Sequence, residues 1–288
     1  MSWLLADPSW LSVALAALGL VLLAVSLMWL LSILLRDAGI ADVFWGTGFA
    51  ILALFYAVTS DGLMARKVLM SGLTVVWGTR LSVHILRRSR GQPEDPRYAA
   101  WRTAAGGGFW WKSYFSVFLL QGILMWLISA PLLIGQASAS PARLTILDAL
   151  GSGLWAVGFL FEAVGDAQLR RFKVDPANKG QVLQGGLWAY TRHPNYFGDS
   201  LVWWGYFLIA LSVPKGGWTI FSPLLMTLLL LRVSGVTLLE RRLRESKPKY
   251  AEYVSRTSAF IPWPPSRPRE TSMTERPEPV ETQLDEGS

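Results

Sequence analysis

The sequence predicts an all-α, polytopic membrane protein with seven transmembrane helices. Only 16% of its 288 residues are charged and 52% are apolar, whereas an ordinary soluble domain has about 25% charged residues. Several windows of about twenty residues contain almost no charge, which is typical of membrane-spanning helices. Tryptophans near the ends of these windows are interpreted as interface anchors of an aromatic belt. They are Trp3, Trp10, Trp110, Trp111 and Trp218.

Seven apolar segments approach the length needed to cross about 30 Å of hydrocarbon. The second and sixth are short, so we expect their ends to tilt or to lie at the interface. The first is expected to stay in the mature protein, because the residues before it lack the basic start of a signal peptide. The predicted spans are Leu11–Leu35, Val43–Thr59, Val68–Leu86, Tyr114–Gly135, Thr145–Val164, Phe197–Val213 and Trp218–Leu239.

Basic residues gather in alternate loops, after the third, fifth and seventh spans. By the positive-inside rule the N-terminus lies outside and the C-terminus faces the cytoplasm. Three regions follow from the spans: residues 1–112 with the first three spans and a cytoplasmic loop, residues 113–265 with the last four, and residues 266–288. The last region is rich in Pro, Glu, Ser and Thr and is predicted to be disordered.

Composition also excludes several kinds of site. The chain has no Cys and only two His, so no metal centre is expected. No glycine-rich nucleotide fingerprint, Walker sequence or serine elbow is present. The basic loops lie next to the membrane, so nucleic acid is not an expected partner.

The densest group of polar residues is the segment Gly185–Asp199, directly before the sixth span. Pro194 suits the first turn of a helix, so the following helix is predicted to begin near it. A helix N-terminus offers free N–H groups to an anion, and phosphate is the first hypothesis for that anion. The candidate binding residues of this segment are Tyr190, Arg192, His193, Asn195, Tyr196 and Asp199.

Ionisable residues inside spans are costly and often mark function. In the fifth span Glu162, Asp166 and Arg170 recur every four residues, with Lys173 three further on. They form either a surface salt-bridge ladder or part of a site. Arg232 in the seventh span either reaches the surface or points inward to a phosphate.

Two further groups belong to the N-terminal spans. Trp77, Arg80 and His84 lie on about one face of the third span and indicate a polar inner wall. Asp42 at the start of the second span either caps that helix or is catalytic. The catalytic candidates are Asp42, Trp77 and Arg80.

In combination, these segments resemble the steroid 5-alpha-reductase family, especially its uncharacterised bacterial branch. The resemblance extends to about Pro265, whereas Arg-His-Pro-x-Tyr alone also occurs in isoprenylcysteine and phospholipid methyltransferases, which bind S-adenosylmethionine with it. The matching stretches are Gly185–Asp199, Arg232, Tyr250–Pro262, Asp42–Phe49, Trp77–Leu81 and Glu94–Tyr98.

The resemblance implies seven helices that enclose NADPH, on the cytoplasmic side, and a lipid-like substrate. The family's Asn-x-x-Gly-acidic segment falls on Asn195, Gly198 and Asp199, and its Asn-x-x-x-Asp-x-x-x-Arg helix has Glu162 in place of the Asn. Asp42 is similar to the Glu that polarises the substrate, but Trp77 stands at the position of the family's Tyr. The remaining cofactor-binding residues by resemblance are Asp166, Arg170, Arg232, Tyr253 and Arg256.

The resulting hypothesis is a reductase of an activated C=C bond in a steroid-like or other apolar lipid. The NADPH phosphates would contact Arg170, Lys173, Arg192 and Arg232, and a buried, protonated Asp42 would polarise the substrate carbonyl. Residues 1–112 would then form the substrate side and residues 113–265 the cofactor side, in a bacterial inner membrane among its lipids. The alternatives are an S-adenosylmethionine-dependent methyltransferase and a non-catalytic lipid-binding protein; the number of cations near Asn195 favours NADPH.

Overall fold

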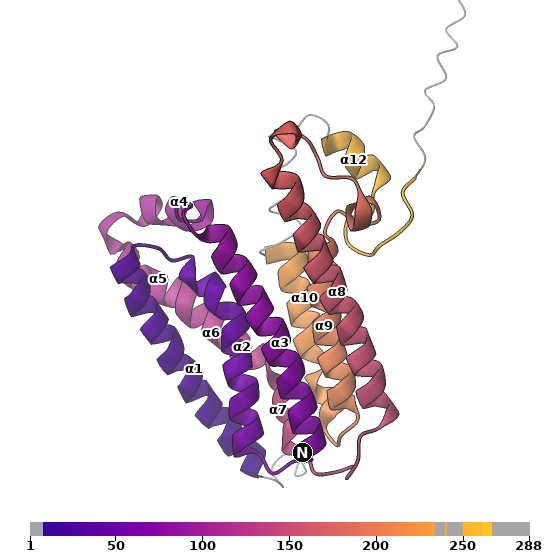
Figure 1. Ribbon diagram of the computed structural model, residues 1–288. Helices are drawn as coiled ribbons and strands as arrows, with labels where there is room; N and C mark the ends of the chain where they lie inside the picture. Colours follow the sequence, from indigo (N-terminus) through magenta and orange to yellow (C-terminus); the bar gives the residue numbers. More distant parts are fainter. Residues whose placement is uncertain (1–7, 234–239, 241–249, 267–288) are drawn as a thin grey trace, which may run out of the picture.

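The computed structural model describes residues 8–233, 240 and 250–266, and these form a bundle of helices with no strand among them (Figure 1). Long apolar runs without proline or glycine clusters favour this result. In chain order the elements are α1 Pro8–Leu35, α2 Ile40–Thr59, α3 Met64–Ser89, α4 Pro96–Ala105, η2 Gly106–Gly108, α5 Phe109–Ser113, η3 Tyr114–Leu119, α6 Leu120–Ile128, α7 Ala130–Ala137, α8 Ile146–Val174, η4 Pro176–Asn178, η5 Gly186–Ala189, α9 Pro194–Leu211, η6 Gly216–Ile220, α10 Phe221–Leu228, η7 Leu229–Val233 and α12 Tyr250–Arg256.

Five helical runs of the described chain are long and apolar enough to cross a membrane: Trp10–Leu35, Ile40–Thr59, Met64–Ser89, Pro96–Ala137 and Ile146–Val174. The sixth and seventh predicted spans correspond to α9 and to the shorter apolar helix Gly216–Arg232. The all-helical membrane class is therefore confirmed, while the count of seven crossings and the orientation of the termini stay predictions. The predicted boundary between residues 112 and 113 falls inside the continuous helical run Pro96–Ala137. The C-terminal tail that was predicted to be disordered lies outside the described residues from 267 onward.

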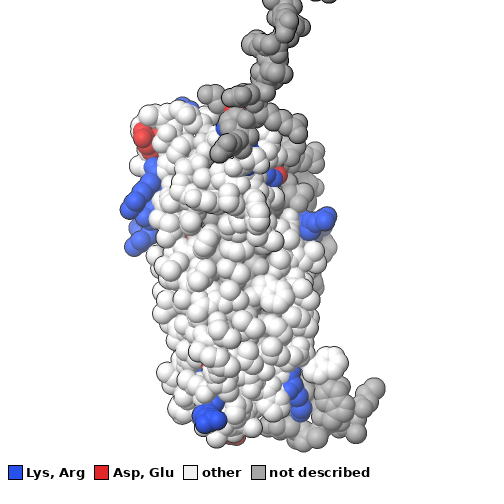
Figure 2. Space-filling model, turned by 90° about the vertical axis from the view of Figure 1, so that its right-hand side faces the viewer, with Lys and Arg blue, Asp and Glu red and all other residues white. Residues whose placement is uncertain are grey.

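The outer surface suits a hydrocarbon environment. Large apolar side chains such as Leu23, Leu34 and Leu160 are exposed along the long helices. In Figure 2 the charged side chains lie towards the two ends of the molecule, with an uncharged band between them. Apolar exposure on this scale is unusual for a soluble monomer, and it is the expected surface of an integral membrane protein.

Glycines allow a close helix contact between α8 and α9. A Cβ atom added at Gly151 would lie 2.6 Å from the carbonyl oxygen of Gly205, and one added at Gly158 would lie 2.6 Å from that of Gly198. The seven-residue spacing places these glycines on one face of each helix. Because small residues allow backbones to approach closely, this contact brings the start of α9 against the last turns of α8.

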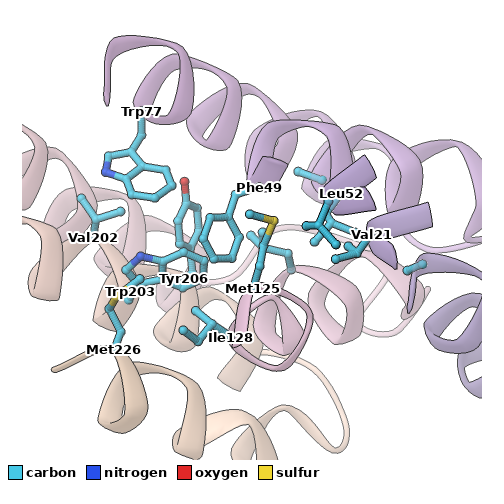
Figure 3. Close-up of a cluster of buried hydrophobic side chains, with 14 of the residues drawn as sticks. Val21, Phe49, Leu52, Trp77, Met125, Ile128, Val202, Trp203, Tyr206 and Met226 are labelled. Carbon is cyan, nitrogen blue, oxygen red and sulfur yellow. The ribbon is translucent and has the colours of Figure 1, made fainter. Parts of the chain in front are cut away.

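An aromatic core fills the centre of the bundle (Figure 3). The indoles of Trp77 on α3 and Trp203 on α9 meet edge to face, with ring centroids 5.7 Å apart. The ring centroid of Phe49 on α2 lies 4.5 Å from that of Trp203. All three side chains are fully buried. This core fixes α2, α3 and α9 relative to one another immediately beside the polar groups described next.

Candidate functional site

Three helices bring a polar cluster together inside the bundle, which we call the Arg80 cluster: Trp77, Arg80 and His84 of α3, Glu162 and Asp166 of α8, and Asn195 and Asp199 of α9. On each helix the members recur at three- or four-residue spacing, so each helix presents them on one face. The site is therefore built by packing three polar faces against one another.

Arg80 is the centre of this cluster. Its guanidinium forms ion pairs with both Glu162 and Asp166, and the indole nitrogen of Trp77 donates to Glu162 Oε2 at 2.9 Å. Both carboxylates are buried. Since Asp166 bonds Arg80 instead of Arg170, the surface ladder considered for α8 does not form.

The first turns of α9 complete the cluster. Asn195 Nδ2 donates to Asp166 Oδ1 at 3.0 Å, and His84 Nε2 lies 3.5 Å from Asp166 Oδ2. Asn195 Oδ1 is buried and has no hydrogen-bond partner among the described residues, whereas the indole N–H of Trp203 lies close to the Asp199 carboxyl group. A buried acceptor without a donor is rare in native structures, so Asn195 Oδ1 marks a place where a ligand could donate a hydrogen bond.

Cations stand at the rim of the Arg80 cluster, towards the α4 end of the bundle. Arg88 and Arg170 lie within electrostatic range of His84, and both side chains are exposed, as is that of Lys173. Arg232 is also exposed. The convergence of Arg170, Asn195 and Arg232 on one cavity stays a prediction.

Asp42 does not cap α2 and is instead bonded to residues of α4. Its carboxylate accepts hydrogen bonds from Arg97 Nη2 and the hydroxyl of Tyr98, each at 2.7 Å, and its side chain is 23% exposed. The helix cap at Gly39 involves no side-chain bond. The expected buried position is therefore corrected: the Asp42 side chain is partly exposed and holds two donors of α4, a cation and a phenol, in place. Whether this group contacts a substrate stays a prediction.

Several of the remaining candidates hold the C-terminal segment to the bundle. The buried Arg192 pairs with Glu240 at 2.7 Å and donates to the carbonyl oxygens of Val254 and Thr257. The hydroxyl of Tyr253 on α12 donates to the carbonyl oxygen of Trp188. These bonds occupy Nε and Nη1 of Arg192, one of the four cations that were expected to contact phosphate.

Three other candidates of this region lie near the same contacts. The imidazole of His193 is buried and stacks on the ring of Tyr196, with centroids 5.5 Å apart. Tyr190 is exposed. Arg256 pairs with Glu252 at 2.9 Å and contacts Gln184. A part in cofactor binding stays a prediction for each of them.

The pairing of Glu240 gives a testable pH dependence. Burial raises the pKa of Glu240, but hydrogen bonds from His193 and Arg192 outweigh it and lower the pKa to about 2, from an unfolded value of about 4.3. A carboxyl whose folded pKa is depressed stabilises the fold above the unfolded pKa and loses this contribution as pH falls. We expect thermal stability in detergent to drop between about pH 4.5 and pH 2.

The matched measurement uses Glu240→Gln, which removes the titrating group. This variant should melt lower than the parent at pH 6, and the difference between the two should shrink as the pH approaches 2. A difference that is constant over this range would show that Glu240 does not respond to pH as the structure indicates.

Fold and site together define an all-helical membrane protein with a buried polar cluster between α3, α8 and α9. The chain belongs to the family described as "Protein of unknown function (DUF1295)", whose match covers residues 28–257. This family is steroid 5-alpha-reductase-like, in agreement with the resemblance found in the sequence.

Individual relatives differ in how much of the chain they cover. Uncharacterized protein C594.04c of Schizosaccharomyces pombe is 24% identical over 264 residues, 82% of this chain and 76% of that protein. Human 3-oxo-5-alpha-steroid 4-dehydrogenase 1 is 35% identical over 74 residues, 25% of this chain and 28% of its own. A probable O-methyltransferase, ustE of Ustilaginoidea virens, is 44% identical over 62 residues, 22% of this chain and 20% of its own. No solved structure matches this chain.

The sequence pattern identified most members of the Arg80 cluster but missed the groups around Asp42 and at the rim. Arg97 and Tyr98 occurred only as part of the Glu94–Tyr98 stretch, and Arg88 only as one of many basic loop residues. The signal that could have singled out Tyr98 is that a phenol follows directly after an arginine in a short polar loop next to two spans.

Proposed function

We propose that this protein is a membrane reductase that uses NADPH to reduce an activated C=C bond in an apolar, steroid-like lipid. The observation that supports this most is the buried acceptor oxygen of Asn195, which has no donor among the described residues, beside the ion-paired Arg80. The similarity to proteins named 3-oxo-5-alpha-steroid 4-dehydrogenase supports the same class of reaction. A bacterial inner membrane, with the cofactor on the cytoplasmic side, is part of the proposal.

Two groups of residues fit different parts of NADPH. Asn195 Oδ1 and Asp199 Oδ1 can accept hydrogen bonds from ribose hydroxyls or a carboxamide N–H, which are the donors that the cofactor offers. The exposed Arg88 and Arg170 at the rim suit its phosphates. When bound, NADPH supplies a hydride and leaves as NADP⁺.

The chain's own contribution is to position groups and to stabilise charge. Addition of a hydride to the β-carbon of an enone moves the C=C electron pair onto the carbonyl oxygen, and the α-carbon then takes a proton from water. Arg97 would stabilise the oxyanion through Nη1, while Asp42, held by the hydroxyl of Tyr98, fixes the position of the Arg97 guanidinium. Arg80 would hold Glu162 and Asp166 in fixed positions, so that Asn195 keeps its orientation.

One observation favours a methyltransferase as the second candidate. Three carboxylates, Glu162, Asp166 and Asp199, stand in the buried part of the Arg80 cluster against the single guanidinium of Arg80. Carboxyl groups in this number can compensate the positive charge of a cationic cofactor such as S-adenosylmethionine. A relative named a probable O-methyltransferase agrees with that alternative. A lipid-binding protein without catalysis would bind neither cofactor.

Cofactor binding separates these possibilities. A ligand that binds only the folded state stabilises it by about 2.7 kcal/mol at a hundredfold excess over its Kd. We expect NADPH, and neither NADH nor S-adenosylmethionine, to raise the melting temperature of the purified protein in detergent. Asn195→Ala should abolish this rise, whereas Asn178→Ala in the exposed η4 region should keep it. Stabilisation by S-adenosylmethionine alone would reverse the order of the two candidates.

Hydride transfer provides the direct test of the reaction. A 3-keto-4-ene steroid and NADPH deuterated at the transferable position should give a product heavier by one deuterium at the β-carbon, as read by mass spectrometry. Tyr98→Phe should slow this transfer and leave the NADPH-induced stabilisation unchanged. Transfer that is equally fast in this variant would show that the bond from Tyr98 to Asp42 does not position Arg97 for the reaction.

A further inference from the structure

A cavity lies at the end of the bundle opposite the Arg80 cluster. Its volume is about 230 Å³, and its lining includes Tyr56 near the end of α2 and Lys215 just after α9. Asn195 stands in the first turn of α9. Since an α-helix rises 1.5 Å per residue, the length of α9 separates the cavity from the cluster by about 25 Å. The cavity is therefore a separate site.

The walls of this cavity are almost entirely apolar. They come from α1, α2, α6, α7, η6 and α10, with side chains such as Ala14, Trp126, Leu133 and Phe221. Trp218 and Phe221 at the cavity are exposed large apolar residues, so the opening continues into the apolar outer surface of the bundle. A lipid chain in the surrounding bilayer can reach this space without crossing water.

Two polar groups in the lining are left without partners among the described residues. The indole N–H of Trp10 is buried and has no acceptor. Lys215 is half-buried, has left-handed backbone geometry with φ of +67°, and its ammonium has no acceptor in the described part of the chain. By contrast, the nearby cations Lys67 and Arg66 are bonded to the Ser60 carbonyl oxygen and to Asp148.

These groups define the chemistry of the occupant. An ammonium at the mouth attracts an anionic headgroup, and an orphan N–H in an apolar wall is satisfied by a carbonyl oxygen. The hydroxyl of Tyr56 is already bonded to Ser129 at 2.8 Å, so the deeper wall offers only apolar contact. The volume lies below the range of about 300–1,000 Å³ for pockets that hold drug-sized ligands, which suits one chain segment better than a rigid ring system.

We propose that this cavity binds one acyl chain of an anionic phospholipid, with the headgroup at Lys215 and an ester carbonyl oxygen at the Trp10 N–H. The site is independent of the proposed reductase chemistry, because it lies at the other end of the bundle and needs no cofactor. The lipid would fill the space between α1 and the η6–α10 segment and would hold these two parts of the chain together.

The test uses the full chain in lipid nanodiscs that contain a phosphatidylglycerol with a photoreactive diazirine in one acyl chain. After illumination we expect crosslinked peptides from residues 126–134 and 215–221. Lys215→Gln should reduce this crosslinking about fivefold, the effect of one cation beside an anionic headgroup, and Lys215→Arg should restore it. The same probe with a phosphatidylcholine headgroup should crosslink weakly and respond little to either change.

Matched variants keep the result interpretable. Lys112→Gln removes an exposed cation at the other end of the bundle and should leave the crosslinking intact. Ala130→Phe fills the cavity and should abolish it, while Leu54→Phe on the exposed outer surface should not. Crosslinks spread evenly over the apolar surface, or crosslinks that appear only after deletion of residues 2–7, would overturn the proposal. Neither readout depends on NADPH, so failure here is distinct from failure of the proposed reductase function.

Discussion

Arg80→Met is expected to destabilise the protein by about 3–5 kcal/mol, the cost of removing one partner of a buried ion pair. The guanidinium is shared by Glu162 and Asp166, and their side chains are only 4% and 8% exposed. Without Arg80 these carboxylates remain buried beside each other and beside Asp199. The loss is measured as the shift in denaturant or thermal unfolding in mild detergent.

Two substitutions on the same helix calibrate this result. Arg88→Met removes an exposed guanidinium about two turns further along α3 and should change stability by no more than about 0.5 kcal/mol. Arg80→Lys should fall between the two, because an ammonium cannot reproduce the fork of donors that a guanidinium offers two carboxylates. If the Arg80→Met and Arg88→Met variants have the same unfolding midpoint, the ion pairs of Arg80 do not stabilise the fold.

Gly158→Leu is expected to separate α8 from α9 and to abolish any NADPH-induced stabilisation along with much of the fold's stability. Already the Cβ of an alanine at this position would lie 2.6 Å from the Gly198 carbonyl oxygen and 2.8 Å from the Val202 nitrogen. These atoms are backbone and cannot turn aside. Overpacking of this kind costs about 1–3 kcal/mol for a small group, and a leucine adds three more carbon atoms.

A neighbouring glycine on the same helix is the control. Gly153 has open space around it, with nothing within 4 Å of an added Cβ. Gly153→Ala should therefore preserve the fold and can raise its stability slightly, since alanine favours the helix by about 1 kcal/mol. Gly158→Ala should lower the unfolding midpoint. Equal midpoints for these two alanine variants would contradict the close approach of α8 and α9.

Much of this fold follows from the sequence alone. Long apolar runs with few charges satisfy their backbone as helices inside a membrane, and α2, α3 and α9 lie close to the predicted spans. The fourth run already begins at Pro96 and α8 continues to Val174, well beyond the predicted bounds. Spacing also assigned Glu162 and Asp166 to one face of α8 and Trp77, Arg80 and His84 to one face of α3. These are local properties, because the period of an α-helix fixes which residues share a face.

Partners across helices could not be read from spacing. Asp166 has Arg170 four residues away on its own helix, yet it pairs with Arg80 from α3 and with Asn195 from α9. The glycine contacts decide this, since they bring α9 against α8 and close the space around Asp166. Arg192 likewise lies in a segment whose residue types predict an anion site, but the fold brings Glu240 and two carbonyl oxygens to its guanidinium.

The sequence by itself determined the helical membrane class, the polar face of each helix and the family likeness, because each depends on residues near one another in the chain. Only the tertiary structure decided that Arg80 would bind two carboxylates, that Asp42 would hold Arg97 and Tyr98, and that Lys215 would stand at an apolar cavity. Those outcomes depend on how closely whole helices approach, and this is set by packing between residues tens to hundreds of positions apart.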